Sequence, residues 1–415
     1  MVKKEFVALF SLCTLFTLDC GAGYVDSRNW GERVEYVGAR DGVLGSVLLE
    51  EFPAFWPKDS KLEITETAEL TNLFQDEFRS KEPLQEGAFS HLRAPLWPSA
   101  RLALSNPYPV YLRLGYAGAQ VFRWKGEGAL YDAGSRSGAV TLNDRGEIPW
   151  VRLGVAVPLE DRFFAGLNFN FAQGSRRTDF KKEDKDRNVI YDFSENTSFK
   201  GNAWGAQFFG LITEGWGVGF AFEGKSRLSG YASNLTHQST TTAGSSSPNA
   251  GTIWDMPESW KFMVVKKDSR SRIFVGELEW VRYSKMRVNG RLVDIAGTGF
   301  FIDDPDFQRE AFGSSVVSLP SYHDAVGIKL GLENPLTEQY VLRLGSQFWT
   351  HYADPRLITP TLSIGLGVKA KSWLDLDFGF SFSNRDYFGD GLFWPKDARI
   401  RETEISLSTS LRIKI

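Results

Sequence analysis

The side chains that most often carry out chemistry are few and scattered in this chain. Its four histidines are His91, His237, His323 and His351. None of them has the spacing to another histidine that metal ligands usually have. Ser321 stands close to the pair His323 and Asp324, but nearness in sequence is weak support for a hydrolase, because a catalytic triad is defined by its geometry. The sequence therefore predicts no metal site, no cofactor and no catalytic residues, and an enzyme is not expected.

Two carboxylates, Asp375 and Asp377, lie within the stretch WLDLDFGFSFS at Trp373–Ser383. Side chains two residues apart share one face of a strand, so the pair could act as acid and base or could line a wet interior. The rest of the stretch favours the interior, because leucine and phenylalanine alternate with aspartate, glycine and serine throughout it. The stretch Gly215–Gly219 lies in a similar alternating segment, where glycine gives room for close packing rather than a dinucleotide loop.

A strand with one wholly apolar face fits two architectures. In a soluble sandwich that face packs on a second sheet, whereas in an outer-membrane barrel it faces lipid and the polar face lines the lumen. The alternation recurs at Val326–Glu333, Ile405–Lys414 and Glu277–Trp280, where charged side chains occupy the polar face. A basic side chain on the lipid face near the midplane would cost about 2–4 kcal/mol, so these charges are expected to face the lumen.

Length and composition restrict the class of protein further. The chain has 415 residues, enough for one large barrel or for two to three ordinary domains, and it is rich in aromatic residues, at 14%, and in glycine, with 40 residues. After the N-terminus no apolar run approaches the roughly 20 residues that a transmembrane helix needs. The formal net charge of -3 gives no electrostatic reason to expect nucleic acid as a partner.

The N-terminal segment 1–22 is predicted to be a secretory signal peptide. Lys3 and Lys4 form its charged part, the segment Phe6–Leu18 is apolar, and Cys20-Gly21-Ala22 ends it with small residues. Cleavage is expected after Ala22, with lipidation of Cys20 as the alternative. Both cysteines of the chain lie in this segment, so the mature chain is expected to have no disulfide and no thiolate metal site.

The next segment, 23–60, has little periodicity but contains a cluster of aromatic residues and prolines. Phe52, Phe55 and Trp56 form this cluster together with two prolines, and an exposed surface segment would rarely carry it. We therefore expect the segment to pack against the rest of the protein. It is either an ordinary N-terminal cap or a plug inside a barrel.

From about Lys61 to the end, the chain is predicted to be a barrel of β-strands. Weaker strand patterns lie at 61–71, 100–104 and 110–124, and clearer ones at roughly 147–158, 161–173, 202–212, 215–228, 257–267, 271–284, 322–333, 338–349, 360–370, 373–384 and 402–415. Short turns are expected at 158–161, 213–215, 267–270, 334–338 and 371–372, and long polar connections at about 174–201, 229–256, 285–321, 350–359 and 385–401. Short and long connections alternate, as in barrels whose short turns face the periplasm.

The count of strands follows from this alternation. If the last strand runs toward the periplasm, counting backward makes the strand at 147–158 run the same way, and three earlier strands bring the total to fourteen. An even number is what a single-chain bacterial barrel requires. Tryptophans near predicted strand ends are expected to form interfacial girdles, and these are Trp216, Trp260, Trp349 and Trp373.

Four pieces of the chain resemble the FadL-type transporters of long-chain fatty acids and hydrocarbons in the Gram-negative outer membrane. Two are fairly specific: MPESWKFMVVKKDSRSRIFVGELEWVRYS at Met256–Ser284, and Tyr322–Phe348, where His323-Asp324 opens a strand and Leu342-Arg343-Leu344-Gly345 follows a turn. The other two, Pro149–Gly174 and Gly217–Gly230, fit many barrels. The resemblance implies a fourteen-stranded barrel with an N-terminal plug, and passive uptake of hydrophobic molecules that leave sideways through a gap in the wall.

Under this resemblance, the expected ligand contacts are Phe52, Phe55 and Trp56 in the plug, which would otherwise only pack against the wall. Arg343 faces the lumen by alternation and is expected to pair with a carboxylate head group or with an acidic residue of a neighbouring strand. The expected partners are a hydrophobic small molecule, the bilayer with its lipopolysaccharide, and the barrel-assembly machinery, with the protein acting as a monomer. Two rivals remain, a porin-like channel for polar solutes and an outer-membrane hydrolase. An apolar pocket under the loops would favour the transporter over the porin.

Overall fold

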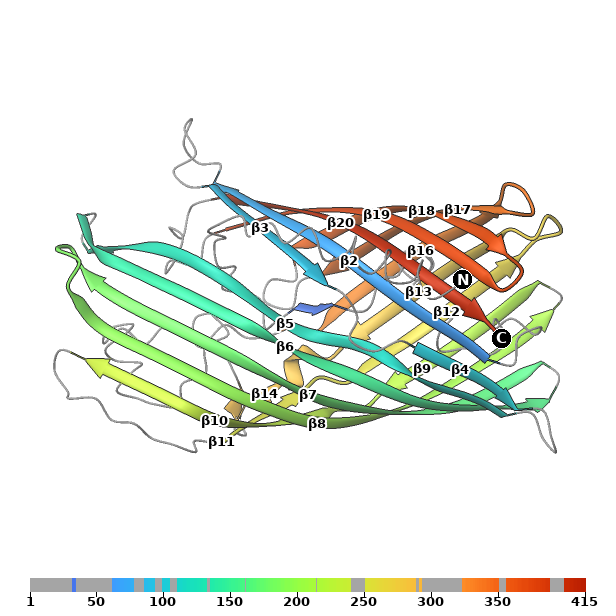
Figure 1. Ribbon diagram of the computed structural model, residues 1–415, viewed down its shortest axis with the longest axis horizontal. Helices are drawn as coiled ribbons and strands as arrows, with labels where there is room; N and C mark the ends of the chain where they lie inside the picture. The colour runs from blue at the N-terminus through green and yellow to red at the C-terminus, as the bar shows by residue number, and fades with distance from the viewer. Residues whose placement is uncertain are drawn as a thin grey trace, which may run out of the picture.

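The computed structural model shows a protein made almost wholly of long antiparallel strands (Figure 1). The residues that it describes are 32–34, 62–77, 86–93, 99–104, 110–132, 135–160, 162–213, 215–239, 251–288, 291–292, 323–350, 356–388 and 399–415. The predicted signal peptide lies outside them. No helix among the described residues is both long enough and apolar enough to cross a membrane.

The strands form a single sheet that closes on itself. Its last strand pairs with its neighbour in sequence and also with β2 near the start, through register partners that include Ile64 with Ile413 and Leu70 with Leu407. The strands are β1 (Glu32–Val34), β2 (Leu62–Glu77), β3 (Glu86–Arg93), β4 (Ser99–Leu104), β5 (Val110–Asp132), β6 (Ser135–Glu160), β7 (Phe163–Asp184), β8 (Val189–Thr213), β9 (Trp216–Glu223), β10 (Ser226–Ser239), β11 (Gly251–Met256), β12 (Ser259–Lys267), β13 (Ile273–Val281), β14 (Arg287–Val288), β15 (Arg291–Leu292), β16 (Ala325–Pro335), β17 (Tyr340–Thr350), β18 (Ile358–Lys371), β19 (Leu374–Phe388) and β20 (Arg399–Lys414).

Within the described residues these strands make fourteen passes of the barrel wall, as predicted. Three passes are interrupted, since β3 continues into β4, β9 into β10 and β11 into β12. With these joined, the passes are β2, β3–β4, β5, β6, β7, β8, β9–β10, β11–β12, β13, β16, β17, β18, β19 and β20. The predicted fold class, a transmembrane antiparallel barrel of about fourteen strands, is therefore confirmed.

A band of exposed apolar side chains covers the outer face of the wall. In β19, Phe378, Phe380 and Phe382 point outward while Asp375 and Asp377 are buried inside, as their alternation predicts. The same division holds on β13, where Leu278 and Trp280 are exposed and Glu277 and Glu279 are buried. Such a band is the surface that a barrel presents to lipid. Its other exposed members include Leu153, Leu167, Phe169, Phe171, Trp204, Phe220, Phe262, Ile328, Leu330, Leu344, Ile364 and Leu407.

Strands β5 to β8 and β10 extend well beyond this band, at the end opposite the C-terminus (Figure 1). The prediction of a long loop at 174–201 is therefore wrong, because β7 and β8 continue through it to a short turn at 185–188. The segment 229–256 is also partly strand. Both segments carry polar residues on both strand faces, so they lack the apolar alternation that reveals a strand beside lipid.

The wall is interrupted between β3 and β5. β3 pairs with β2, and among the described residues no pairing joins β3 to β5. On that side β5 pairs with β4 through Ala100–Leu104 and, farther along, with β1, where Glu32, Arg33 and Val34 lie opposite Val121, Gln120 and Ala119. Figure 1 shows β1 in this space. β1 is the part of the predicted plug segment 23–60 that the structure describes.

Two turns at opposite ends of the barrel have the same construction. In the turn after β7, Asp184 Oδ1 accepts hydrogen bonds from the amides of Asp186 and Asn188, both at 2.8 Å. In the turn after β12, Asp268 Oδ1 accepts the equivalent bonds from Arg270 and Arg272, both at 2.9 Å. Side-chain hydrogen bonds, from Asn188 and from Arg272, hold the pKa of each carboxyl below its usual range. Residues of the turns are thus fixed by an aspartate rather than by glycine.

Candidate functional site

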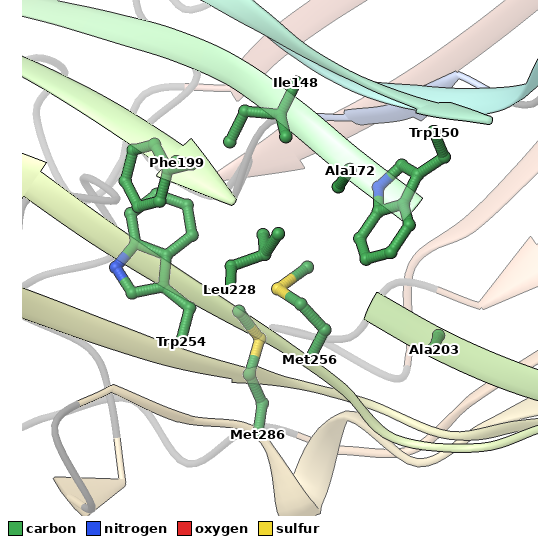
Figure 2. Close-up of a cluster of buried hydrophobic side chains, with 9 residues drawn as sticks. All are labelled: Ile148, Trp150, Ala172, Phe199, Ala203, Leu228, Trp254, Met256 and Met286. Atoms are coloured by element: carbon green, nitrogen blue, oxygen red, sulfur yellow. The ribbon is translucent and has the colours of Figure 1, made fainter. Parts of the chain in front are cut away.

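A cluster of buried apolar side chains lies on the inner face of the wall, and we call it the lumenal apolar cluster. Figure 2 shows its members converging from β6, β7, β8, β10 and β11, with one further residue that follows β13. The members are Ile148, Trp150, Ala172, Phe199, Ala203, Leu228, Trp254, Met256 and Met286, and Tyr283 packs against them. Phe199 and Trp254 form its aromatic part, with ring centroids 4.5 Å apart.

The cluster is built on one row of register partners that crosses five strands. Trp150 lies opposite Ala172, Ala172 opposite Gly201, Gly201 opposite Leu228, and Leu228 opposite Trp254. Cross-strand partners share a face, so all of these positions face the lumen. The small residues in the middle leave room for the large ones, since a Cβ on Gly201 would lie only 2.5 Å from Leu228 Cδ2. The row is therefore a continuous, tightly packed apolar patch in which Leu228 fills the space beside Gly201.

Polar groups bound the cluster on the side of the short turns. Arg152 donates to Asn170 Oδ1 over 2.9 Å, Asn170 donates to Glu223 Oε1 over 3.0 Å, and Arg152 lies 3.6 Å from Glu223. Asn170 also faces Ala203 across the strands, so this triad directly adjoins the cluster. All three groups satisfy one another, as buried polar groups must.

Arg176 bounds the cluster on the opposite side. Its side chain is buried, and its guanidinium carbon lies 5.6 Å from the centroid of the Trp254 ring. Six residues of β7 separate Asn170 from Arg176, which is about 20 Å along a strand. The inner face thus offers an extended apolar zone with a cationic group at its outer end. Such an arrangement fits an elongated apolar molecule, and a planar guanidinium fits a carboxylate.

The turn that supplies Met286 is held by Asp324. A short 3-10 helix, η2 (Tyr283–Lys285), precedes Met286, which is completely buried in the cluster. Asp324 Oδ1 accepts bonds from Ser284 Oγ at 2.5 Å and from Ser284 N at 3.1 Å, and its Oδ2 accepts one from Trp280 Nε1 at 3.2 Å. His323, beside it, is exposed. Asp324 therefore fixes a turn of the lumenal wall, and Ser321 and His351 lie outside the described residues.

The opposite side of the lumen carries buried charges beside a second buried apolar cluster, which consists of Phe209, Ala221, Met263, Val265 and Val275 on β8, β9, β12 and β13. We call the first set of charges the Lys329 network: Lys329 Nζ lies 2.9 Å from Glu277 and 3.1 Å from Glu279, and Lys261 lies 3.7 Å from Glu279. These residues belong to β12, β13 and β16, and Lys261, Glu277 and Glu279 are almost completely buried. The mutual pairing stabilises charges that could not remain there singly.

The second set, the Arg343 network, connects β16 to β20. Arg343 lies 2.8 Å from Glu333 and 2.5 Å from Asp377, and Asp377 in turn lies 3.6 Å from Arg412. The network continues through Asp375, which lies 3.6 Å from Arg412 and 2.6 Å from Lys414. The expected pairing of Arg343 with acidic residues of nearby strands is thus present.

Gly367 allows Arg343 to reach Asp377 across the intervening strand. Arg343 is on β17 and Asp377 on β19, so their ion pair passes over β18. A Cβ on Gly367 would lie 2.8 Å from both Arg343 Nη2 and Asp377 Oδ1. Trp349 likewise packs against a glycine, Gly327, on the lumenal face. Lys329 Nζ lies 5.6 Å from the centroid of the Trp349 ring. The prediction that Trp349 belongs to an interfacial girdle is therefore wrong, because its strand position is lumenal.

The structure describes one of the four predicted ligand contacts. Arg343 lies in the network just described, whereas Phe52, Phe55 and Trp56 lie outside the described residues. Sequence reasoning missed the lumenal apolar cluster and Arg176. Phe199, Trp254 and Arg176 fell in segments predicted to be loops. The signal that could have identified a strand there was the alternation of small and large residues on either side of Gly201.

Comparisons with known proteins identify the fold. One similar structure is that of a FadL homologue of Pseudomonas aeruginosa, which has 13% sequence identity and a TM-score of 0.57. The match covers 95% of this chain and 100% of that one. The toluene transporter TodX of Pseudomonas putida has 13% identity, a TM-score of 0.60 and coverage of 95% and 99%. The toluene transporter TbuX of Ralstonia pickettii has 10% identity, a TM-score of 0.53 and coverage of 86% and 90%.

No protein-family model and no curated protein sequence matches the chain. The likeness to solved structures extends over nearly the whole chain, whereas the sequence identity is low. The chain therefore has the fold of the FadL-type and hydrocarbon channels.

Proposed function

We propose that this protein is an outer-membrane channel for the passive uptake of hydrophobic compounds such as long-chain fatty acids. The observation that carries the proposal is the lumenal apolar cluster, which lies between the Arg152 triad and Arg176. Lipopolysaccharide is a polar barrier to apolar solutes, and an apolar site within a barrel stabilises such solutes while they cross it. The similar structures include two toluene transporters, which supports a hydrophobic cargo.

Arg176 favours a cargo with an anionic head group. An apolar chain would lie along the row from Trp150 to Trp254, and its carboxylate would bind the buried guanidinium at the outer end in addition to the contacts that Arg176 already makes. A charge-assisted hydrogen bond in such a setting is stronger than one in water. Arg343 is assigned to the wall, because Glu333 and Asp377 already surround it.

The N-terminal segment 23–60 is proposed to be a plug that contacts the cargo through Phe52, Phe55 and Trp56. The pairing of β1 with β5 supports an attachment of this segment to the barrel wall. The interrupted pairing between β3 and β5 supports a sideways exit for the cargo. In this proposal the protein is exported by its signal peptide 1–22, is inserted by the barrel-assembly machinery, works as a monomer and catalyses no reaction.

A porin-like channel for small polar solutes is the second candidate. The Lys329 and Arg343 networks favour it, because they line much of the lumen with charge. Their charges are paired with one another, however, which reduces the field that a passing ion would meet. We therefore rank uptake of hydrophobic compounds first.

Single-channel recording in a planar bilayer separates these two functions. The transporter is expected to show low conductance, together with saturable binding of a long-chain fatty acid to the refolded protein. A steady open conductance that the fatty acid does not change, without saturable binding, would replace the proposal with the porin.

The variant Arg176→Gln tests the head-group assignment. The dissociation constant for a long-chain fatty acid should rise about tenfold, which corresponds to about 1.4 kcal/mol, while that for the alcohol of the same length should change little. Arg162→Gln, at an exposed short turn, is the control and should leave both constants unchanged. If Arg176→Gln weakens the acid and the alcohol equally, the guanidinium contributes packing rather than head-group recognition.

A further inference from the structure

Two arginines lie opposite each other in one row across β6 and β7. Arg145 is the register partner of Arg177, and both side chains are exposed. Directly opposite residues on antiparallel strands share a face, with their Cβ atoms about 4.5–5.5 Å apart. Like charges in such positions repel one another and destabilise the sheet. The row therefore requires a source of negative charge.

The row lies on the outer face of the barrel. Arg145 and Arg177 are exposed, and Arg177 retains 50% of its side-chain accessibility. The next residue inward, Arg176, is buried against the lumenal apolar cluster, as alternation requires. Asp179 occupies the Nε side of Arg177 at 3.1 Å, and among the described side chains Arg145 makes no ion pair. Asp179 thus pairs with Arg177, and Glu147, which lies opposite the exposed Ser175, is a second acidic group on this face near the row.

The position of the row relative to the apolar band indicates its surroundings. On β7 the last exposed apolar residue is Phe171, and Arg177 follows six residues later, about 20 Å along the strand. Lys200 lies between these levels, because it is the register partner of Gln173 and is exposed on the outer face. Basic side chains therefore begin just beyond the apolar band and continue outward on the side of the long connections.

Neighbouring charges on this face are already paired. Arg227 lies 2.7 Å from Asp255, and Lys181 lies 2.5 Å from Glu183. Arg145 and Lys200 differ from them in having no such partner among the described side chains. Arg145 and Lys200, with Arg177 directly opposite Arg145, are therefore the basic groups of this face that a further anion could bind.

We propose that the arginine row, with Lys200 below it, binds the phosphate groups of lipopolysaccharide. This rests on the proposed outer-membrane location, where the lipid beside this face carries phosphorylated sugars directly above its acyl chains. A guanidinium presents a planar set of donors that matches phosphate oxygens, and neighbouring guanidiniums can share one phosphate. The bound phosphates would remove the repulsion within the row and hold the barrel at a fixed depth and orientation.

Titration of the refolded full-length protein with Kdo2-lipid A in detergent tests the proposal. Wild-type protein should bind it at least tenfold more tightly than the same lipid with its phosphates removed, and the preference should fall as salt is raised. The double variant Arg145→Gln/Arg177→Gln should lose most of this preference. The double variant Lys369→Gln/Lys371→Gln, which removes the same charge at exposed positions of the opposite end, should keep it.

Two further measurements make the result decisive. Arg145→Lys/Arg177→Lys keeps the charge but not the planar donors, so its preference should be intermediate. Saturable fatty-acid binding by the same preparations shows that each variant is folded, and it tests the proposed cargo separately. Equal binding of phosphorylated and dephosphorylated lipid by the wild type, or an unchanged preference in Arg145→Gln/Arg177→Gln, would overturn the proposal whatever the fatty-acid result.

Discussion

The two sides of the lumen are packed in different ways, one mainly by apolar side chains and the other mainly by ion pairs. From β6 to β11 the inner wall carries the lumenal apolar cluster, whose contacts are non-directional. From β12 to β20 it carries the Lys329 and Arg343 networks, in which each charge lies against a partner, and only β12 and β13 add buried apolar side chains of the second cluster, Met263, Val265 and Val275. An apolar guest can replace contacts between apolar side chains at little loss, whereas a guest that separates buried ion pairs leaves charges unpaired. The comparison therefore predicts that an apolar guest would bind at the first side and that the second side makes the barrel rigid.

Both sides depend on small residues that open space for large ones. In the apolar cluster, Gly201 accommodates the side chain of Leu228. In the Arg343 network, Gly367 leaves the space that the ion pair of Arg343 and Asp377 occupies. Glycine lowers the β propensity of a strand, so its use at both positions indicates that lumenal packing outweighs local preference.

The largest effect is expected for Asp377→Asn, which tests the rigid side. Removing this charge leaves Arg343 and Arg412 buried with fewer anions, and breaking a buried pair typically costs about 3–5 kcal/mol. Urea unfolding in lipid vesicles measures the loss. Fatty-acid affinity of the folded protein should stay unchanged, because the apolar cluster lies elsewhere on the wall.

Asp255→Asn is the control for that variant. Asp255 pairs with Arg227 at 2.7 Å, but both side chains are accessible, and exposed pairs contribute less than about 1 kcal/mol. Similar losses for Asp377→Asn and Asp255→Asn would show that the lumenal network is hydrated and adds little rigidity.

The next effect in size is expected for Gly367→Ala. The added methyl group would lie 2.8 Å from atoms of both Arg343 and Asp377, and separating them should cost about 1–3 kcal/mol. Gly276→Ala is a matched control, because its nearest neighbour would be Leu330 Cδ2 at 3.8 Å. Unfolding of both variants in vesicles gives the difference, and equal stability would mean that the ion pair does not need the space above Gly367.

The sequence revealed the fold wherever a strand has lipid on one side and water on the other. Asp375 and Asp377 were placed correctly inside the barrel because phenylalanines alternate with them, and a charge on the lipid face is expensive. The parity of the connections gave the correct number of passes for the same reason. Where both faces of a strand meet polar surroundings, as at Arg176 and Arg177, that energetic difference disappears and alternation gives no signal.

The site was harder to predict than the fold because its members are far apart in sequence. Phe199 and Trp254 meet only because β8, β10 and β11 are neighbours in one register, which no local pattern reveals. Trp349 was assigned to the wrong face because the prediction relied on its position near a strand end and not on the alternation that places it on the lumenal face. The lumenal position of Arg343 and its pairing with acidic residues of nearby strands were predicted correctly from alternation, whereas its contact with a ligand stays a prediction.

A smaller effect is expected for Asp324→Ala, which affects the apolar side. Loss of the bonds from Ser284 and Trp280 should cost about 1–2 kcal/mol and loosen the turn that brings Met286 into the cluster. Affinities for a fatty acid and for the alcohol of equal length should fall together, because the effect is on apolar packing. His323→Ala, one residue earlier and exposed, should change neither affinity. Unchanged affinities in Asp324→Ala would show that Met286 is not part of the binding site.

The smallest effect is expected at the two aspartate turns, which lie outside both lumenal regions. Ser271 has a φ of 60° and Arg187 a φ of 64°, a left-handed conformation that side chains disfavour and glycine accepts. Ser271→Gly and Arg187→Gly should each stabilise the protein by up to about 1 kcal/mol, less the entropy that glycine adds to the unfolded chain. Urea midpoints in vesicles measure the change. Because the turns share one hydrogen-bond pattern, their gains should be equal, and a larger gain at Arg187 would indicate that the extended β7–β8 hairpin adds strain that the short turn lacks.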